Sequence, residues 1–576
     1  MLDFERMLQR ALKHCGQAPV TIAMPYDLPQ RFLEPHLTHG RVRGVVADAV
    51  DQASVSPRCA GWWVDRERGH LSLRSRMVDT LVLVGVDTRY RVGPRLLLEA
   101  RLKGVSRVVA IDRSGDPVED LCVAQALLER VDAGSARAWM PDYAAAFDDM
   151  YERVGDRLRL PDSAFSADRL VLAIGTLGPG GAERQGAYTA GGAIGRGGLQ
   201  TYVVCEHLEP PADFFRPYVE SRGATVLLVP SSPPELADPE LRAIHQQLDE
   251  DYRGLGFGDI FIQIVRYASL LRAIRPAVVH SWMDYCNVLC GSAAALVGVP
   301  GLLLGCRSMA PDHFHIFQPY MRAGYRSLIG RRPALMLNNS RAGAADYARW
   351  LRIDGLMPDV IHNGFEFPDA AAQTRASARA ALGFGDGHRV IGSMLRFSEE
   401  KRPELLVDAA AIMHGRDANC RFVFYGTGAL LETVRAKVRA AGLTDVVLLP
   451  GVTDAAWEAL SAMDLFMLAS RMEGLPNVMV EAQALGVPVV CTGVGGMTET
   501  FINGQTGVAV PEATAEALAA AAADILDDAH VHRSMAARAR EHARNHFGIA
   551  RMVDETLAAY RRARDAYPTH QPRMAA

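Results

Sequence analysis

Two glutamates stand eight positions apart in a mostly apolar stretch of the chain, SRMEGLPNVMVEA (residues 470–482). Carboxylates rarely lie in apolar surroundings unless hydrogen bonds or opposite charges hold them there. Proline pre-sets φ for a first helical turn, so a helix is expected to begin near Pro476. Glu473 then lies in the loop before this helix, and Glu481 points inward from more than one turn into it.

The backbone between the two glutamates is predicted to bind an anion. The N–H groups of Gly474 and Leu475 are expected at the helix N-terminus, where the helix dipole favours negative charge. The two carboxylates can therefore hold hydroxyl-bearing groups on either side of one phosphate, and a sugar nucleotide has this order of sugar, diphosphate and ribose. The alternative is structural: a carboxylate at a helix start and an unrelated buried ion pair.

Two cations follow a second apolar run, in GSMLRFSEEKRPELL. Arg396 and Lys401 lie five positions apart on a loop that leads into a helix. Cations at the mouth of a parallel sheet can neutralise a diphosphate. The alternative for this pair is solvated surface charge.

The glycine-rich loop GTLGPGGAERQ joins the end of a predicted strand to a helix that is expected to begin near Ala182. Its glycines allow the backbone to approach a ligand, and the helix N-terminus offers free N–H groups to an anion. No Lys-Ser/Thr pair follows the glycines, so this is not a Walker A loop. The alternative is a tight connection without a ligand.

The elements that must position these residues alternate between strands and helices. Short β-branched runs such as RLVLAIG, PAVVHSW, RVIGSML and PVVCTGV are separated by alanine- and leucine-rich helical stretches. Apolar strands that alternate with helices indicate parallel sheets buried on both faces, and hence doubly wound α/β domains. We predict an N-terminal α/β block over residues 1–165, a second domain over 168–380, a third over 385–550, and a C-terminal helix and tail over 551–576.

Composition restricts the class of protein. The 576-residue chain is too long for one core, and 49% hydrophobic with 22% charged residues is typical of globular proteins. A formal net charge of −4 argues against nucleic-acid binding. The nine cysteines contain no C-x-x-C pair, as in a reducing compartment, and no apolar run reaches bilayer length. A cytoplasmic protein is predicted, with peripheral contact at the inner face of a membrane as an option.

Several motifs, in order, resemble the retaining GT-B glycosyltransferases of family 4 (group 1). EGLPNVMVEA, followed by ALGVPVVCTGVGGMTETFINGQTGVAVP, resembles the E-x7-E region of that family, and GGAERQ resembles its N-terminal glycine loop. VIHNGFEF resembles the turn before the C-terminal domain, and GSMLRFSEEKRPELLVDA its G-R-x4-K-G loop. The resemblance covers about residues 168–550 and implies two Rossmann-like domains that face a cleft, while the first block lies outside it.

The resemblance also implies roles for individual residues. Glu481 would hold the ribose hydroxyls of the donor, and Glu473 the hydroxyls of the transferred sugar. Arg396 and Lys401 would neutralise the departing diphosphate. The remaining donor-binding positions are Gly180, Gly181, Gly474, Leu475 and Asn477.

His280 falls at the first of two histidines that are often present in the central segment of the family, and it would contact the sugar near its reacting carbon. Where many members have the second histidine, this chain has Trp282, so a purely structural histidine stays an alternative. The usual G-R pair is Leu395-Arg396 here, and the aspartate of N-G-x-D is replaced by Glu366.

The predicted function is transfer of a sugar, with retention, from a UDP- or GDP-linked donor to a glycan, lipid-linked or protein acceptor in surface polysaccharide or glycoconjugate synthesis. No cofactor and no metal are predicted, because no D-x-D clamp follows a strand; the cluster from Asp312 to His315 is interpreted as a polar loop. The alternatives are a nucleotide-sugar epimerase on the same fold, or a non-catalytic sugar-binding scaffold. The N-terminal block is predicted to contact a partner, a membrane or the acceptor.

Overall fold

The computed structural model describes six strands between residues 20 and 111, and then residues 143–566 except 232–235, 237, 253–257, 315–316, 319 and 369–371. The chain divides into two compact units. The first comprises residues 1–159, 230–269 and 311–327, and the second comprises 160–229, 270–310 and 328–576. All the predicted site residues belong to the second unit.

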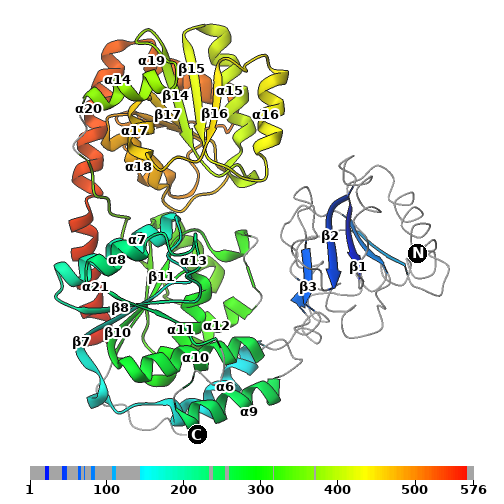
Figure 1. The fold of residues 1–576 in the computed structure, drawn as a ribbon, viewed down its shortest axis with the longest axis vertical. Coiled ribbons are helices and arrows are strands. Elements are labelled where there is room, and N and C mark those ends of the chain that lie inside the picture. Colours follow the sequence, from blue (N-terminus) through cyan, green and yellow to red (C-terminus); the bar gives the residue numbers. More distant parts are fainter. Residues whose placement is uncertain are drawn as a thin grey trace. The chain divides into compact units, whose positions relative to one another are not determined.

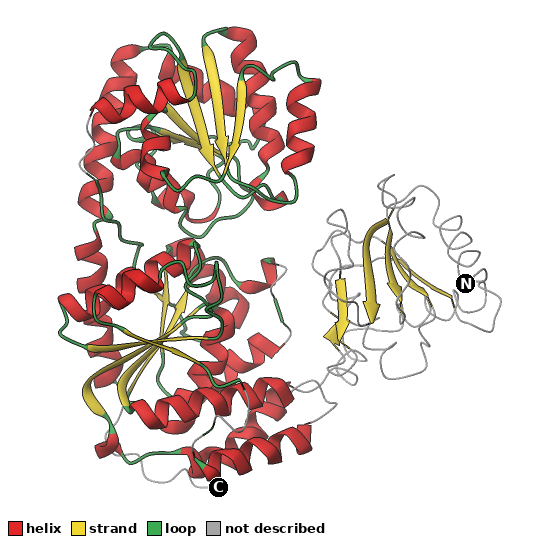
Figure 2. Cartoon of the chain, in the orientation of Figure 1, coloured by secondary structure: helices red, strands yellow, loops and turns green. Residues whose placement is uncertain are grey.

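The second unit contains two parallel sheets with helices on both faces (Figures 1 and 2). We call the domain built on the first of these sheets the N-lobe. Its strand order is β13-β12-β11-β10-β7-β8-β9. The strands are β7 (Ser166–Ala173), β8 (Gln200–Cys205), β9 (Thr225–Leu228), β10 (Pro276–Trp282), β11 (Gly301–Cys306), β12 (Leu335–Asn338) and β13 (Asp359–Val360).

The central strands of the N-lobe are buried on both faces, as their continuous apolar runs predict. On one face, α7 (Gly181–Gly195) and α8 (Arg216–Ser221) cover β7 to β9, and on the other α11 (Asp284–Val297) covers β10 and β11. The helix that follows β12 is α13 (Arg341–Leu351), whose first turn is capped by the hydroxyl of Ser340.

The second sheet forms the C-lobe, with the strand order β16-β15-β14-β17-β18-β19. Its strands are β14 (Arg389–Met394), β15 (Cys420–Tyr425), β16 (Val447–Gly451), β17 (Leu465–Leu468), β18 (Val489–Cys491) and β19 (Gly507–Ala509). Its helices are α14 (Ala372–Ala381), α15 (Pro403–Arg416), α16 (Leu431–Ala440), α17 (Ala456–Ser461), α18 (Asn477–Ala484), α19 (Ala515–Leu526) and α20 (Ala529–His546).

Both sheets reverse their strand order at one point, between β7 and β10 in the N-lobe and between β14 and β17 in the C-lobe. Chain connections leave such a switch point in opposite directions, so they open a crevice at the carboxyl ends of the strands where ligands bind. The glycine loop follows β7, the loop with Arg396 follows β14, and the loop with Glu473 follows β17. The predicted pair of doubly wound domains is thus confirmed.

The last helix, α21 (Ile549–Asp565), packs on the N-lobe rather than on the C-lobe that precedes it. Its apolar side chains, including Met552 and Tyr560, join Leu170 and Val278 of the N-lobe sheet in one core cluster. In Figure 1 this red helix lies beside the N-lobe sheet and α7. The chain therefore crosses between the lobes twice, and after the second crossing α21, the last described helix, packs on the N-lobe.

The first unit contains a third sheet, in the order β4-β3-β2-β1-β5-β6. Its strands are β1 (Val20–Met24), β2 (Val42–Asp48), β3 (Trp62–Asp65), β4 (His70–Leu71), β5 (Thr80–Val84) and β6 (Arg107–Ile111), and all pairs are parallel except β3 with β4. The helices predicted between these strands lie outside the described residues. The same unit includes α6 (Tyr143–Leu158) and α9 (Pro239–Tyr252), while α10 (Gly258–Ile274) and α12 (Tyr320–Arg331) begin in it.

Candidate active site

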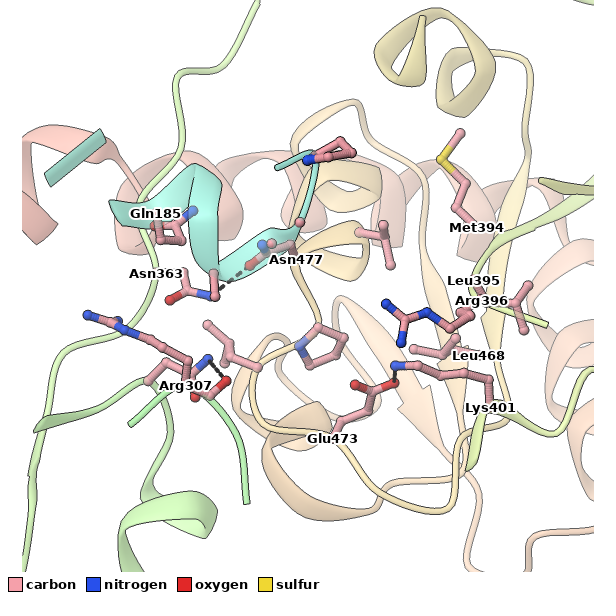
Figure 3. A pocket seen from close by; sticks show the side chains of 18 residues that line it. Gln185, Arg307, Asn363, Met394, Leu395, Arg396, Lys401, Leu468, Glu473 and Asn477 are labelled. Carbon is pink, nitrogen blue, oxygen red and sulfur yellow. Dashed lines mark hydrogen bonds and ion pairs between the residues drawn. The ribbon is translucent and has the colours of Figure 1, made fainter. Parts of the chain in front are cut away.

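A cavity of about 450 Å³ lies between the carboxyl ends of the two sheets of the second unit. Its N-lobe wall contains the start of α7, and its C-lobe wall contains the loops after β14 and β17 (Figure 3). Of the predicted site residues, those that line this cavity are Gly180, Gly181, Arg396, Lys401, Glu473, Leu475 and Asn477. Residues that are up to about 300 positions apart in the sequence therefore meet in one place.

The two carboxylates of the E-x7-E segment flank the start of α18. Pro476 is the N-cap of this helix, which begins at Asn477 as the proline predicts. Glu473 lies in the loop that lines the cavity and is 9% exposed, whereas Glu481, which is 3% exposed, lies within the helix and does not line the cavity. The structure therefore places the two glutamates at different depths.

Glu473 is held by a cation and a hydroxyl group. Its Oε1 accepts hydrogen bonds from Nζ of Lys401 at 2.5 Å and from Oγ of Ser470 at 2.6 Å. Both bonds use the same oxygen, so within the described part of the chain Oε2 has no protein hydrogen bond. Lys401 thus links the diphosphate-facing loop after β14 to the carboxylate loop after β17.

Glu481 forms an ion pair with the N-lobe. Nη1 of Arg184, at the end of the first turn of α7, donates to Oε1 of Glu481 at 2.6 Å. Burial opposes the charge of Arg184, but the nearby carboxylate of Glu481 more than offsets this and raises the pKa of the guanidinium. This pair joins the glycine-loop helix to the helix of the E-x7-E segment.

Two of the glycines lie in close contact with the opposite lobe. A Cβ on Gly181 would lie 2.9 Å from Nδ2 of Asn477, and a Cβ on Gly474 would lie 2.8 Å from Cα of Ser308. A side chain at position 474 would force the backbone at Ser308 to move, since Cβ atoms do not approach other heavy atoms so closely, whereas a Cβ at position 181 would displace only the side-chain amide of Asn477. Leu475 packs into a small cluster with Phe365 and Phe547.

The turn after β13 is tied to both lobes. Gln185 donates to the carbonyl oxygen of Gly364 and accepts from its N–H, both at 2.9 Å, and Nδ2 of Asn363 donates to Oδ1 of Asn477 at 2.7 Å. These bonds satisfy the buried amide of Gln185 and hold the helix starts of α7 and α18 in place.

His280 lies away from the cavity. It is fully buried in β10, its Nδ1 is 3.0 Å from the hydroxyl of Tyr560, and its ring packs against Trp282. Burial, and to a smaller extent the charge of Arg307, hold the pKa of His280 well below its usual range, so the imidazole is neutral at pH 7. This placement favours the structural alternative, and the predicted contact with the sugar stays a prediction.

The residues of the site that were not singled out in the sequence include Arg184, Gln185, Arg307, Asn339 and Asn363. Arg184 and Gln185 lie within the quoted GGAERQ motif but carry no signal beyond it. Arg307 directly follows the fully apolar strand GLLLGC, and Asn339 directly follows β12. A polar residue immediately after a buried parallel strand is the available signal, because such residues gather at the ligand-binding edge.

The segment from Asp312 to His315 extends beyond the described residues at His315. Within the portion that the structure describes, no three His, Cys, Asp or Glu side chains are grouped as metal ligands would be.

No described helix is long and apolar enough to cross a membrane.

Comparison with known proteins identifies the family. The family described as "Glycosyl transferases group 1" matches residues 374–545. The Vi polysaccharide biosynthesis protein VipC/TviE of Salmonella typhi is 29% identical, over 62% of this chain and 64% of that protein, so the match spans just under two thirds of that relative. The 2-deoxystreptamine N-acetyl-D-glucosaminyltransferase of Streptomyces fradiae is 30% identical, over 51% of this chain and 73% of that protein.

Solved structures support the fold. HepE of Anabaena, in complex with UDP and glucose, matches with a TM-score of 0.54 and 18% identity, over 68% of this chain and 99% of that one. Sucrose-phosphate synthase of Thermosynechococcus elongatus matches with a TM-score of 0.53 and 20% identity, over 69% and 100% of the two chains. These structures share two Rossmann-like domains with the second unit described above. The chain therefore has the GT-B fold and belongs to the group 1 family of glycosyltransferases.

Proposed function

We propose that this protein transfers a sugar, with retention, from a nucleoside-diphosphate sugar to a glycan, lipid-linked or protein acceptor in surface polysaccharide or glycoconjugate synthesis. The observation that carries the proposal is the meeting of Lys401, Arg396 and Glu473 with the glycine start of α7 in one cleft. UDP is the first nucleotide to test, because the HepE structure contains UDP. The proposed location is the cytoplasm or the inner face of a membrane.

The chemistry follows from the charges that develop during transfer. As the bond between sugar and phosphate breaks, negative charge grows on the diphosphate and positive charge grows on the sugar ring. Arg396, Lys401 and the N–H groups at the start of α7 stabilise the diphosphate more in the transition state than in the ground state. Lys401 needs little reorganisation, since Glu473 already holds it in the cleft.

Glu473 is proposed to act on the sugar through its second oxygen. Oε1 is engaged by Lys401 and Ser470, which leaves Oε2 to accept hydroxyl groups of the transferred sugar. A carboxylate paired with a lysine is a weak nucleophile, because the cation stabilises its charge. This favours front-face transfer without a covalent glycosyl-enzyme intermediate.

Glu481 is proposed to bind the ribose. Its Oε1 is engaged by Arg184, and its Oε2 would accept a ribose hydroxyl. Because Glu481 does not line the cavity as it stands, a small opening between α7 and α18 must accompany nucleotide binding. Asn477 and the N–H groups that follow Gly474 would lie between the ribose and the sugar.

A nucleotide panel in a thermal-shift assay tests the proposal. A ligand present at one hundred times its Kd should stabilise the protein by about 2.7 kcal/mol. We expect UDP and UDP-linked sugars to differ from GDP and GDP-linked sugars in this assay, so that the nucleobase decides which of the two sets binds. No shift with any nucleotide would favour the scaffold alternative, and isomerisation of the donor without an acceptor would favour the epimerase.

Metal dependence separates this site from D-x-D glycosyltransferases. Two cations face the proposed diphosphate position, so we expect turnover to survive EDTA. Loss of turnover in EDTA with recovery in Mg²⁺ or Mn²⁺ would contradict the metal-free proposal.

A further inference from the structure

Arg307, at the end of β11, lines the cleft on its N-lobe wall and is only partly exposed. Its guanidinium stacks on the indole of Trp282, with Cζ 3.4 Å from the ring centroid. Its Nε is buried and has no hydrogen-bond partner among the described residues. In the part of the chain that the structure describes, no carboxylate forms an ion pair with this arginine.

A cation in this position normally has a counter-charge. Burial lowers the pKa of Arg307 to about 9, so the guanidinium is still protonated at pH 7. Two other cations of the site have a carboxylate partner, Arg184 in Glu481 and Lys401 in Glu473. Arg396 has no ion pair among the described residues, but it faces the proposed diphosphate. Removing an arginine from water without an acid beside it is costly, and an anionic ligand in the cleft would offset that cost.

The position of Arg307 separates it from the diphosphate. Figure 3 shows Arg307 on the opposite side of the cavity from Arg396 and Lys401, with its guanidinium extending away from Lys401 and Glu473. Its backbone is held by a hydrogen bond, which its carbonyl oxygen accepts from Nδ2 of Asn339 at 3.0 Å. The same oxygen packs closely against Gly474, since a Cβ atom added to that glycine would lie only 3.1 Å from it. The stacking on Trp282 fixes the plane of the guanidinium.

We propose that Arg307 binds an oxyanion of the acceptor, a sugar carboxylate or a phosphate ester, and thereby selects acidic acceptors. The planar guanidinium can donate two parallel N–H hydrogen bonds to two oxygens of either group. Trp282 covers one face of the guanidinium, so the N–H groups at its edge stay free to donate. Arg307 is in the N-lobe, across the cleft from the diphosphate-facing cations, so the anion it meets belongs to the second substrate. This inference rests on the proposed transferase function.

The test uses three acceptors that differ only at C6: methyl glucoside, methyl glucuronide and methyl glucoside 6-phosphate. The donor is the glucosyl or mannosyl nucleotide that the nucleotide panel selects. Turnover is measured, and acceptor binding is measured by saturation-transfer NMR with nucleoside diphosphate present. We expect the full-length protein to prefer one acidic acceptor, and the carboxylate and phosphate arms identify which oxyanion it is.

In Arg307→Gln, the KM for that acidic acceptor should rise by about 10- to 150-fold, the range for the loss of one charge-assisted hydrogen bond. The Kd of the nucleoside diphosphate and the KM of the neutral acceptor should be unchanged. Arg307→Lys keeps the positive charge but lacks the paired N–H groups of the guanidinium, so it should lose part of the preference for the acidic acceptor. It replaces the glutamine variant in this test if that variant does not fold.

Arg222→Gln is the matched control, because Arg222 also stacks on an aromatic ring, with Cζ 3.5 Å from the centroid of Tyr218, and does not line the cleft. It should leave acceptor preference unchanged. Equal binding and turnover of neutral and acidic acceptors would overturn the inference while the transferase proposal stands. So would weaker nucleoside-diphosphate binding in Arg307→Gln, which would assign Arg307 to the donor. Absence of nucleotide binding and donor turnover in the wild type would instead reject the proposed function.

Discussion

Replacing Glu481 by alanine should weaken nucleotide binding through the ribose. Glu481 is almost fully buried, its Oε1 is held by Arg184 at 2.6 Å, and its Oε2 is left for a ligand. The loss of one charge-assisted hydrogen bond costs roughly 1.5–3 kcal/mol, so the Kd of the nucleoside diphosphate should rise by about 10- to 150-fold.

A nucleoside diphosphate that lacks the ribose hydroxyls completes a double-mutant cycle, in which wild type and Glu481→Ala are each measured with and without those hydroxyls. The wild type should bind the 2′,3′-dideoxy diphosphate about 10- to 150-fold more weakly than the parent, whereas Glu481→Ala should bind both nearly equally. The coupling energy is the difference between the two effects, and isothermal calorimetry measures all four affinities.

Arg184→Ala is the control for a purely structural carboxylate. It removes the partner of Glu481 but keeps the carboxylate, so the penalty for the dideoxy ligand should persist. Breaking the pair also destabilises the protein, by less than the 3–5 kcal/mol typical of fully buried pairs because the side chain of Arg184 is 22% exposed. Zero coupling between Glu481 and the ribose hydroxyls would refute the assignment and leave Glu481 as a link between α7 and α18.

Three further predictions concern the sugar contact, acid stability and the first block. Glu473→Gln should leave nucleoside-diphosphate binding nearly intact and slow transfer by about 10²–10³-fold; equal damage to both, by calorimetry and turnover, would argue for a structural role. Burial alone would raise the pKa of Glu499, but hydrogen bonds from His362 and two backbone N–H groups hold the pKa below its usual 4.5. The stability that Glu499 contributes should therefore be present above about pH 4.5 and be lost as the pH falls through the lowered pKa. The Tm difference between wild type and Glu499→Gln should shrink in acid, and a constant difference would contradict this prediction. A chain that begins at Asp142 keeps α6 and every cleft residue and should still bind nucleotide, and a folded truncation that does not bind would show that the first block contributes to the site.

Local chemistry made much of the site readable from the sequence. Continuous apolar runs predict buried parallel strands, and polar residues directly after such runs lie at the ligand-binding edge. Pro476 predicts the start of α18, and the glycine loop predicts the start of α7, because both depend on the φ preferences of single residues. The spacing of Glu473 and Glu481 likewise indicates one loop carboxylate and one helix carboxylate.

Tertiary structure alone decided which groups meet. The pairing of Lys401 with Glu473 and of Arg184 with Glu481 depends on which strand ends are neighbours and on how closely α7 approaches α18, and no local propensity encodes either. The burial of His280 against Tyr560 requires that α21 return to the N-lobe, which its amphipathic pattern does not specify. Arg307 is one arginine among many in the sequence. It becomes a candidate ligand-binding residue only because the fold stacks it on Trp282 at the cleft, with no carboxylate beside it among the described residues. That arrangement arises from contacts between segments far apart in the chain.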